Sequence, residues 1–321
     1  MRLYSVIIPV YNRPAEIREL LESLTKQTYN HFEVLVVEDG STSKCEDIVA
    51  SFGDRLNVTY LYKTNSGQGF SRNYGYERAK GDYFVVFDSD CIIPPHYFEA
   101  VEKHLNATCL DAYGGPDKSH DSFTAIQKAI SYSMTSLFTT GGIRGRKQHI
   151  GTFHPRSFNM GISREVFEKT KGYIIPFMGE DIEFSIRIVE NGFKTGLIPD
   201  AYVYHKRRTS LGQFFRQLHF FGRARINVSR FYAGELKAVH FFPLLFLLGV
   251  ISYFLLPLIS LSLFKWGSLL FGIYFFLIFL DASVKNKSLK VGILSIAASF
   301  IQLSAYGLGF FTEGIRRFFR G

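Results

Sequence analysis

The sequence predicts an α/β protein in which a mostly parallel sheet has helices on both faces. An amphipathic interfacial helix and C-terminal transmembrane helices are expected to follow the sheet. Short apolar runs alternate with helix-period patterns in roughly the first two-thirds of the chain, as in parallel sheets. Beyond Phe241 the composition becomes membrane-like. Apolar residues make up 47% of the 321, so a large core is available.

The strands of the predicted sheet are short apolar runs bounded by turn residues. The helix after the first run carries Ile17, Leu20, Leu21 and Leu24 on one face, and Pro14 suits its first turn. Gly67-x-Gly69 lies in a loop that leads into another helix. The expected strands are Leu3–Val10, Phe32–Val37, Asn57–Tyr62, Tyr83–Asp88 and Ile198–Tyr204.

Acidic residues end two of these strands. Asp88 and Asp90 follow the buried run 83–87, and Asp39 follows the second strand. Ligands of open α/β sheets bind outside the carboxyl ends of the strands. Two carboxylates at such an edge can hold a cation of the Mg or Mn type. The alternative is that these acids only cap turns, but acids at two separate strand ends favour the functional interpretation.

The loop around Gly67-x-Gly69 is a weak signal by itself. It lacks the third glycine of a dinucleotide fingerprint, and the chain has no Gly-x-x-x-x-Gly-Lys motif. The loop is either an ordinary helix entry or a backbone that approaches a phosphate, with Arg72 as the counter-charge.

Several ordered motifs resemble the nucleotide-sugar domain of inverting family 2 glycosyltransferases, which have the GT-A fold. The chain departs from the pattern at Glu38, where many relatives carry a second Asp; this matters little if Asp39 contacts the base. The motifs are Ser5-Val6-Ile7-Ile8-Pro9-Val10-Tyr11-Asn12, Val36-Val37-Glu38-Asp39-Gly40-Ser41, Arg72-Asn73-x-Gly75, Asp88-Ser89-Asp90 and Gly179-Glu180-Asp181-Ile182-Glu183.

The resemblance implies a binding site for a nucleotide-sugar donor. Pro9, Tyr11 and Asp39 would hold the base and ribose, and Arg72 would lie near the diphosphate. Uridine is the commonest base in this family, so a UDP-sugar is the expected donor.

The resemblance also implies a divalent metal, Mg²⁺ or Mn²⁺. Asp90 would ligate it directly, and Asp88 would serve the ribose or a metal-bound water. His205, after the last predicted strand, is a further candidate ligand. Alternatively, His205 only begins the basic segment that follows it.

The acceptor side of the resemblance lies at Glu180-Asp181. Adjacent helical residues do not share a face, so only one of the two can point into a site. The resemblance assigns the general base to Asp181. Asn159 would lie near the acceptor or donor sugar, or else is an ordinary loop residue. The segment Thr135–Phe153 is expected to be a lid, or a plain surface loop.

The net charge of +9 indicates an anionic partner, and much of the excess lies within 206–230, just before the apolar region. This position favours membrane phospholipids over nucleic acid, which we do not expect as a partner. The three cysteines show no paired or metal-type spacing, as suits a reducing compartment.

The segment Ser210–Phe231 has the pattern of an interfacial helix with flanking arginines. The alternative is a helix packed on the catalytic domain. Its apolar face comprises Leu211, Phe214, Phe215, Leu218 and Phe221.

Apolar runs at Phe241–Phe264, Gly267–Leu280 and Val291–Phe311 predict two or three spans; the middle run is short. We favour three, although their charges conflict. Basic residues prefer the cytoplasmic side, and three spans would place the two basic groups on opposite sides. These groups are Lys285, Lys287 and Lys290, and Arg316, Arg317 and Arg320.

These patterns give three expected regions: a GT-A catalytic domain at 1–205, a basic interfacial helix at 206–235 and a transmembrane region at 236–321. The expected protein is an inverting hexosyltransferase of the cell (inner) membrane, with its catalytic domain on the cytoplasmic face. Its acceptor would be a polyprenyl-linked saccharide or lipid phosphate in cell-envelope glycan assembly.

Two other functions remain open. One is a processive polysaccharide synthase, which the few spans and Gln217, where such synthases carry Trp, disfavour. The other is a catalytically inactive membrane scaffold, which the intact Asp88, Asp90 and Asp181 disfavour.

Overall fold

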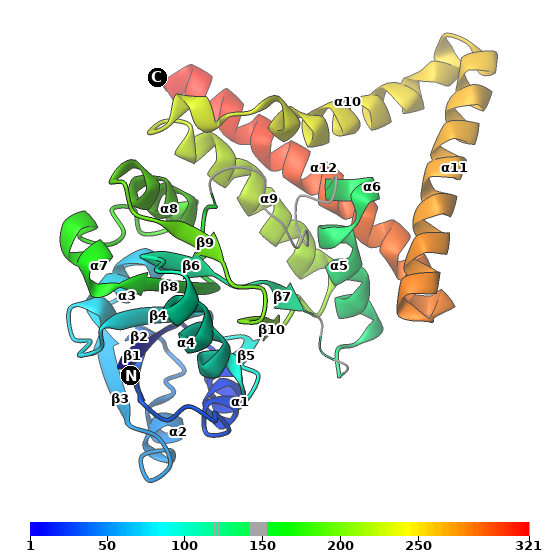
Figure 1. Cartoon of the computed structure of the whole chain (residues 1–321). Coiled ribbons are helices and arrows are strands. Elements are labelled where there is room, and N and C mark those ends of the chain that lie inside the picture. The colour runs from blue at the N-terminus through cyan, green and yellow to red at the C-terminus, as the bar shows by residue number, and fades with distance from the viewer. Residues whose placement is uncertain (119, 121, 141–152, 321) are drawn as a thin grey trace. The chain divides into compact units, whose positions relative to one another are not determined.

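The computed structural model describes residues 1–118, 120, 122–140 and 153–320 (Figure 1). The chain forms two compact units. Unit 1 comprises Met1–His120 and Lys147–Lys206, and unit 2 comprises Asp121–Arg146 and Arg207–Gly321. Most of the expected lid, 141–152, lies outside the described residues.

Within the described residues, unit 1 contains a seven-stranded sheet in the order β3-β2-β1-β4-β8-β6-β9. The first four strands in this order are parallel to one another, and β8 is antiparallel to both of its neighbours. The predicted, mostly parallel sheet is therefore confirmed. The strands are β1 (Tyr4–Val10), β2 (Phe32–Asp39), β3 (Val58–Lys63), β4 (Tyr83–Phe87), β6 (Ala112–Gly114), β8 (Asn159–Ser163) and β9 (Thr195–Leu197).

Helices cover both faces of this sheet because alternate strand residues point to opposite sides. In β1, Val6 and Ile8 pack in the core that contains residues of α1 and α4. Ile7, between them, packs in the core that contains residues of α3 and α8. The helices of unit 1 are α1 (Pro14–Leu24), α2 (Glu46–Ala50), α3 (Gln68–Tyr76), α4 (Tyr97–Ala107), α7 (Arg164–Thr170) and α8 (Glu180–Glu190).

A second, three-stranded sheet positions the end of unit 1. It consists of β5 (Cys91–Ile92), β10 (Val203–His205) and β7 (Asp117–Lys118). The strand expected at Ile198–Tyr204 begins later than predicted. Residues before it form a turn in which Ala201 N donates to Ile198 O, and Pro199 cannot donate to a strand ladder.

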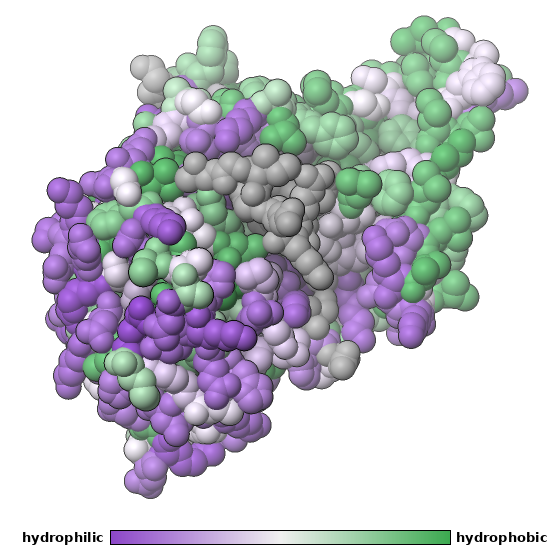
Figure 2. Space-filling view, viewed as in Figure 1, coloured by the Kyte–Doolittle hydropathy of each residue, from purple (hydrophilic) through white to green (hydrophobic). Residues whose placement is uncertain are grey.

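Unit 2 is helical among its described residues, and three of its helices are long and apolar enough to cross a membrane: Ala238–Leu258, Leu261–Asn286 and Leu289–Phe319. Figure 2 shows apolar surface gathered over α10 and α11. The helices of unit 2 are α5 (Ala125–Thr135), α6 (Leu137–Thr140), α9 (Leu211–Val228), η1 (Ala233–Glu235), η2 (Ala238–Phe241), α10 (Phe242–Leu255), η3 (Leu256–Leu258), α11 (Leu261–Asn286) and α12 (Leu289–Arg320).

The first two apolar segments differ in length from the sequence prediction. The first ends near Pro257 rather than at Phe264, because Ser260 starts a new helix as its N-cap and accepts from Leu263 N. The middle segment, expected to be short, is a continuous helix of 26 residues. Its longest uncharged stretch lies between Lys265 and Asp281, and the helix continues past both charged residues. The apolar run alone therefore underestimated the length of the helix.

The apolar face of α9 is covered by protein within unit 2. Phe214 and Leu218 are 0% and 1% exposed, and they pack in one core with Ala298 and Ala305 of α12. The two helices approach closely, since a Cβ on Gly222 would lie 2.1 Å from the carbonyl oxygen of Tyr306. Within unit 2, Phe214 and Leu218 are therefore covered by protein, and the covering helix is α12.

The adjacent phenylalanines of α9 therefore differ in their expected contribution to stability. Phe214 is fully buried, whereas Phe215 is 37% exposed. We expect Phe214→Ser to lower the free energy of unfolding by about 3–5 kcal/mol, the usual cost of removing a buried Phe side chain. Phe215→Ser is the matched control, with a cost of about 1 kcal/mol or less. Thermal unfolding in detergent measures both, and equal losses would contradict the assigned packing.

Candidate active site

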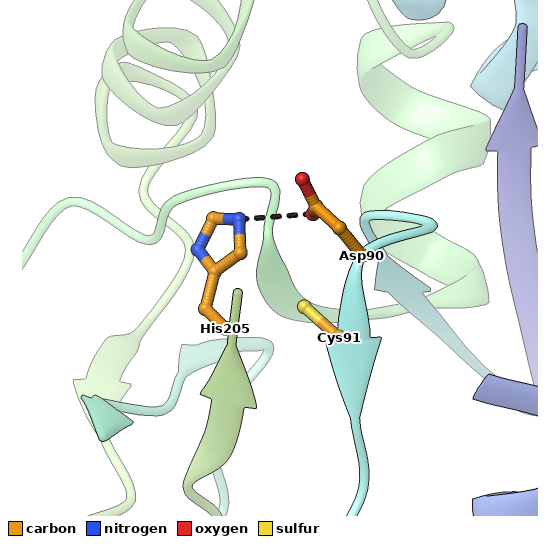
Figure 3. A group of neighbouring side chains, drawn as sticks. All are labelled: Asp90, Cys91 and His205. Atoms are coloured by element: carbon orange, nitrogen blue, oxygen red, sulfur yellow. Dashed lines mark ion pairs between the residues drawn. The ribbon is translucent and has the colours of Figure 1, made fainter. Parts of the chain in front are cut away.

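The acidic end of β4 contacts an arginine and a histidine side chain from distant parts of the chain. Asp90 Oδ1 lies 3.0 Å from His205 Nε2, and Asp90 Oδ2 lies 2.6 Å from Arg13 Nη1. The register of β5 and β10, which pairs His205 with Cys91, brings the imidazole to Asp90. Figure 3 shows Asp90 and His205 pointing toward each other. His205 also stacks on Phe158, at 5.2 Å between ring centroids, which fixes the ring plane.

This group fits a hard divalent cation. Potential ligand atoms of Asp90, Cys91 and His205 all lie within 4.8 Å of one another. Burial, and then the neighbouring Asp90 charge, raises the pKa of the Cys91 thiol, so Cys91 stays protonated and is a poor ligand. A carboxylate oxygen and an imidazole nitrogen remain, a donor set that suits Mn²⁺ and, through its oxygen, Mg²⁺. Of the predicted ligands, Asp88 is not in this group.

Asp88 instead forms the partly exposed end of a chain of charges whose other members, Arg72 and Glu180, are buried. Arg72 is 1% exposed and lies between two acids, with Nη2 3.0 Å from Asp88 Oδ1 and Nη1 3.0 Å from Glu180 Oε1. Gln68 Nε2 also donates to Glu180 Oε1. The guanidinium lies 5.3 Å from the centroid of the Tyr173 ring. Arg72 therefore ties the carboxyl end of β4 to the start of α8.

The adjacent acids at the start of α8 have different environments. Gly179 precedes them with φ +99°, a conformation that glycine adopts readily and that turns the chain into the helix. Glu180 points inward to Arg72, and burial and the Asp181 charge raise its pKa. The Asp181 side chain is 25% exposed, and its Oδ2 lies 3.6 Å from Arg156 Nη1. The prediction that only one of the pair can face a site agrees with this difference, and Asp181 is the accessible one.

The predicted base-binding residues lie at the carboxyl ends of β1 and β2, two strands that pair in the same sheet as β4. Tyr11 is 52% exposed and follows β1, which contains the strand residue Pro9. Asp39 is 4% exposed. Its oxygens accept from Lys63 Nζ at 2.7 Å and from the backbone N–H groups of Ser66 and Gly67, both at 2.9 Å.

Asp39 therefore anchors the glycine loop whether or not it contacts a base. The adjacent Glu38 is fully buried, and its carboxylate accepts from Ser41 Oγ and from Cys45 N. Glu38, the residue that departs from the family pattern, therefore stabilises the turn after β2.

Asn159 does not reach an open surface. Its side chain is fully buried in β8; Oδ1 accepts from Tyr97 OH at 2.6 Å, and Nδ2 donates to Ala201 O at 2.8 Å. Because both polar ends are used internally, the structure gives Asn159 an anchoring position and not the sugar contact that the resemblance implies.

Two residues of this site, Arg13 and Glu180, were not predicted from the sequence. Arg13 follows the first strand, so its position at the same sheet edge as Asp90 was a usable signal. Nothing in the sequence pairs Glu180 with Arg72, which lies 108 residues earlier in the chain.

The comparisons with known proteins agree on one family. The model of the family described as "Glycosyl transferase family 2" matches residues 5–171, which include Asp39, Arg72, Asp88 and Asp90 but not Asp181 or His205. An uncharacterised glycosyltransferase of Rickettsia typhi is 43% identical over 104 residues, which cover 32% of each chain. Another, from Haemophilus influenzae, is 28% identical over 222 residues, which cover 65% of this chain and 71% of the relative.

A solved structure shares the fold along almost the whole chain. The mannosyltransferase PcManGT from Pyrobaculum calidifontis, solved with GDP-Man and Mn²⁺, is 18% identical, with a TM-score of 0.66; the match covers 94% of this chain and 87% of the other. At this identity the likeness shows the fold alone, and several curated relatives are matched over only about a third of their length. Since the family model covers more than half of the residues, the chain belongs to glycosyl transferase family 2 and has the GT-A fold.

Proposed function

We propose that this protein transfers a hexosyl group from a nucleotide-diphospho-sugar to a lipid-linked acceptor, with inversion at the anomeric carbon. The observation that carries the proposal is the Asp88–Arg72–Glu180 chain. It fixes the acidic end of β4 beside the first turn of α8, so a candidate metal site and a candidate base are held in one arrangement.

On the donor side, Pro9, Tyr11 and Asp39 would bind the base and ribose. Uridine is the proposed base, because it is the commonest in the family. Asp88, whose side chain is 33% exposed, would face the diphosphate region, and the buried Arg72 would hold it in place there. The solved mannosyltransferase with GDP-Man shows that this fold accommodates a nucleotide-diphospho-sugar.

Asp90 and His205 would hold Mg²⁺ or Mn²⁺, which supplies charge compensation for the departing nucleoside diphosphate. The Mn²⁺ in the solved mannosyltransferase supports this choice. Arg13, 2.6 Å from Asp90, keeps that carboxylate oriented and adds a positive charge at the same edge.

Asp181 is the proposed general base. It would accept the proton of an acceptor hydroxyl while that oxygen attacks the anomeric carbon from the side opposite the diphosphate. The new glycosidic C–O bond forms as the bond to the diphosphate breaks, in one displacement. Inversion follows, and no carboxylate nucleophile is needed.

The acceptor is proposed to be a polyprenyl-linked saccharide or a lipid phosphate in cell-envelope glycan assembly. The candidate spans Ala238–Leu258 and Leu261–Asn286 are 0% and 6% buried within the protein, as lipid-facing helices are. A lipid-linked acceptor would share their bilayer. The basic segment 206–230 favours the cytoplasmic face of the inner membrane for the catalytic unit.

Asp90→Ala tests the metal site and the enzyme assignment together. We expect it to abolish donor hydrolysis and the rise in melting temperature that Mn²⁺ gives the wild type, because one of two ligands is lost. Asp200→Ala, which removes an exposed carboxylate in a turn, is the matched control and keeps both. If the wild type hydrolyses the donor no faster than Asp90→Ala and a sample without protein, an inactive scaffold is the better description. Long products from a single priming event would favour a processive synthase instead.

A further inference from the structure

The third candidate span, α12, differs from the other two in what covers it. The span windows of α10 and α11 are 0% and 6% buried, whereas that of α12 is 44% buried. Val291, Ala298 and Ala305 are buried in one core with residues of α5 and α9. Gly307 lies close to Pro243 at the start of α10, and Gly292 lies close to Ser283 near the end of α11. Large apolar side chains are exposed along another side of α12: Leu289, Ile293, Phe300, Phe311, Ile315 and Phe318.

Helix α9 packs along α12 from the middle of its apolar run to its C-terminal end. Phe214 and Leu218 share a core with Ala298 and Ala305. Farther along, Arg223 Nε lies 2.9 Å from Glu313 Oε2. At the end, Arg317 Nη1 donates to Ser229 Oγ at 2.9 Å. The first of these contacts lies within the apolar run Val291–Phe311, which would form the hydrocarbon part of a crossing α12, whereas Glu313 and Arg317 lie just beyond it.

The composition of α9 does not suit the bilayer interior. The part of α9 that lies beside the apolar run of α12 carries Arg216, with Gln213 and Gln217, and Arg223 and Arg225 follow it. If α12 crossed the membrane, α9 would have to enter the hydrocarbon with it, since the helices are packed side by side. Charged side chains at that depth are costly and rare. Helix α5, which packs on the other half of α12, contains Lys128 and the buried polar Gln127.

The basic residues at the two ends of α12 also argue against an α12 that crosses the membrane. Lys285, Lys287 and Lys290 lie at its start, and Arg316 and Arg317 lie near its end. Basic residues beside a membrane segment prefer one side. A crossing α12 would separate these groups, whereas an α12 parallel to the surface leaves both on the same side.

Helices α10 and α11 carry the marks of a membrane-crossing pair. Leu258 and Ile259, at the corner between them, are 84% and 76% exposed. Lys265 and Trp266 follow the corner, and such residues are typical of a membrane interface. At the other end of α11, Asp281 accepts from Tyr132 OH of α5 at 2.7 Å, which marks the return to a polar environment.

We propose that α12 lies in the plane of the membrane, on the same face as α9, with its exposed apolar stripe toward the acyl chains. Only α10 and α11 cross the bilayer. The C-terminal end of the chain then lies on the side that bears α9, and α5, α9 and α12 together form a platform on one leaflet.

Cysteine labelling of the full-length protein in sealed vesicles tests this arrangement. Cys109 is exposed, while Cys45 and Cys91 are buried, so a Cys109→Ser background leaves little reaction with a membrane-impermeant maleimide. Single cysteines are then placed by Ser288→Cys, Ile259→Cys and Phe319→Cys. Whether α12 crosses the bilayer or lies in its plane, position 288 is on the same side as unit 1 and position 259 is on the opposite side. Only position 319 discriminates.

We expect Phe319→Cys to react in the same vesicle orientation as Ser288→Cys and as the native Cys109, and at least about tenfold faster there than in the opposite orientation. Reaction of Phe319→Cys together with Ile259→Cys would overturn the proposal. A protease site appended after the last residue tests the same point if lipid shields position 319, because the side from which added protease cleaves it shows where the C-terminal end lies. Cleavage from the Ile259 side would equally overturn it, and cleavage from the Ser288 side would support it.

Discussion

Asp181→Asn is expected to lower the rate of sugar transfer by about 10²–10⁴-fold, the usual contribution of a general base, while donor affinity stays unchanged. The substitution keeps the size of the side chain and removes only its ability to take a proton. Its neighbours Glu180 and Arg72 are buried and already paired with each other, so they do not supply a replacement base.

Transfer assays and donor titration by calorimetry separate the two effects. Asp200→Asn is the matched control, because Asp200 is an exposed turn residue in the same unit. If Asp181→Asn abolishes nucleotide binding as well, Asp181 is a donor-binding residue and the base must be sought elsewhere.

Arg72→Ala is expected to lower the free energy of unfolding of unit 1 by about 3–5 kcal/mol, the cost of breaking a buried ion pair. The substitution leaves Glu180, which is 3% exposed, without its cationic partner. It also releases the end of β4 from α8, so we expect donor hydrolysis to fall with stability.

The deficit caused by Arg72→Ala should depend on pH. Burial and Asp181 raise the pKa of Glu180, and Arg72 opposes them, so its removal raises that pKa further. A carboxyl group whose pKa is higher in the folded than in the unfolded protein lowers the stability of the fold as the pH rises from the unfolded-state pKa to the folded-state pKa. The deficit should therefore be largest at neutral pH and shrink as the pH falls toward about 4.3, the ordinary value for Glu.

Unfolding monitored at several pH values measures this effect. Arg55→Ala, which breaks an exposed pair with Glu22, is the control and should cost about 1 kcal/mol or less. Glu180→Gln combined with Arg72→Ala should cost less than the sum of the two single changes. Additive losses would show that Arg72 and Glu180 act independently.

The sequence was sufficient to predict the sheet and the acidic edge of the site. Buried strands such as 83–87 are continuous apolar runs, and their carboxyl ends share an edge in any parallel sheet. That rule alone was enough to bring Asp39, Asp88 and Asp90 to one side of the fold.

Contacts between distant segments were not predictable from the sequence. His205 reaches Asp90 because β10 pairs with β5, a strand of two residues that has no detectable pattern. The Arg72–Glu180 pair depends on where α8 docks. Asn159 had a plausible loop context, yet β8 buries it completely.

The environment of α9 was ambiguous for a different reason. A helical apolar stripe requires an apolar neighbour but does not specify whether that neighbour is lipid or protein. Only the packing of Phe214 and Leu218 against α12 decides it.

The position of His205 has a practical consequence for anyone who wishes to study the enzyme without detergent. It is the last residue of β10, and unit 1 ends one residue later, at Lys206. A water-soluble fragment therefore has almost no spare sequence at its carboxyl boundary: a cut even two residues too early removes a candidate cation ligand. Such a fragment would also contain α5, whose Ala129, Ile130 and Met134 would lose their partners in α9 and α12, so these newly exposed side chains would need polar substitutions.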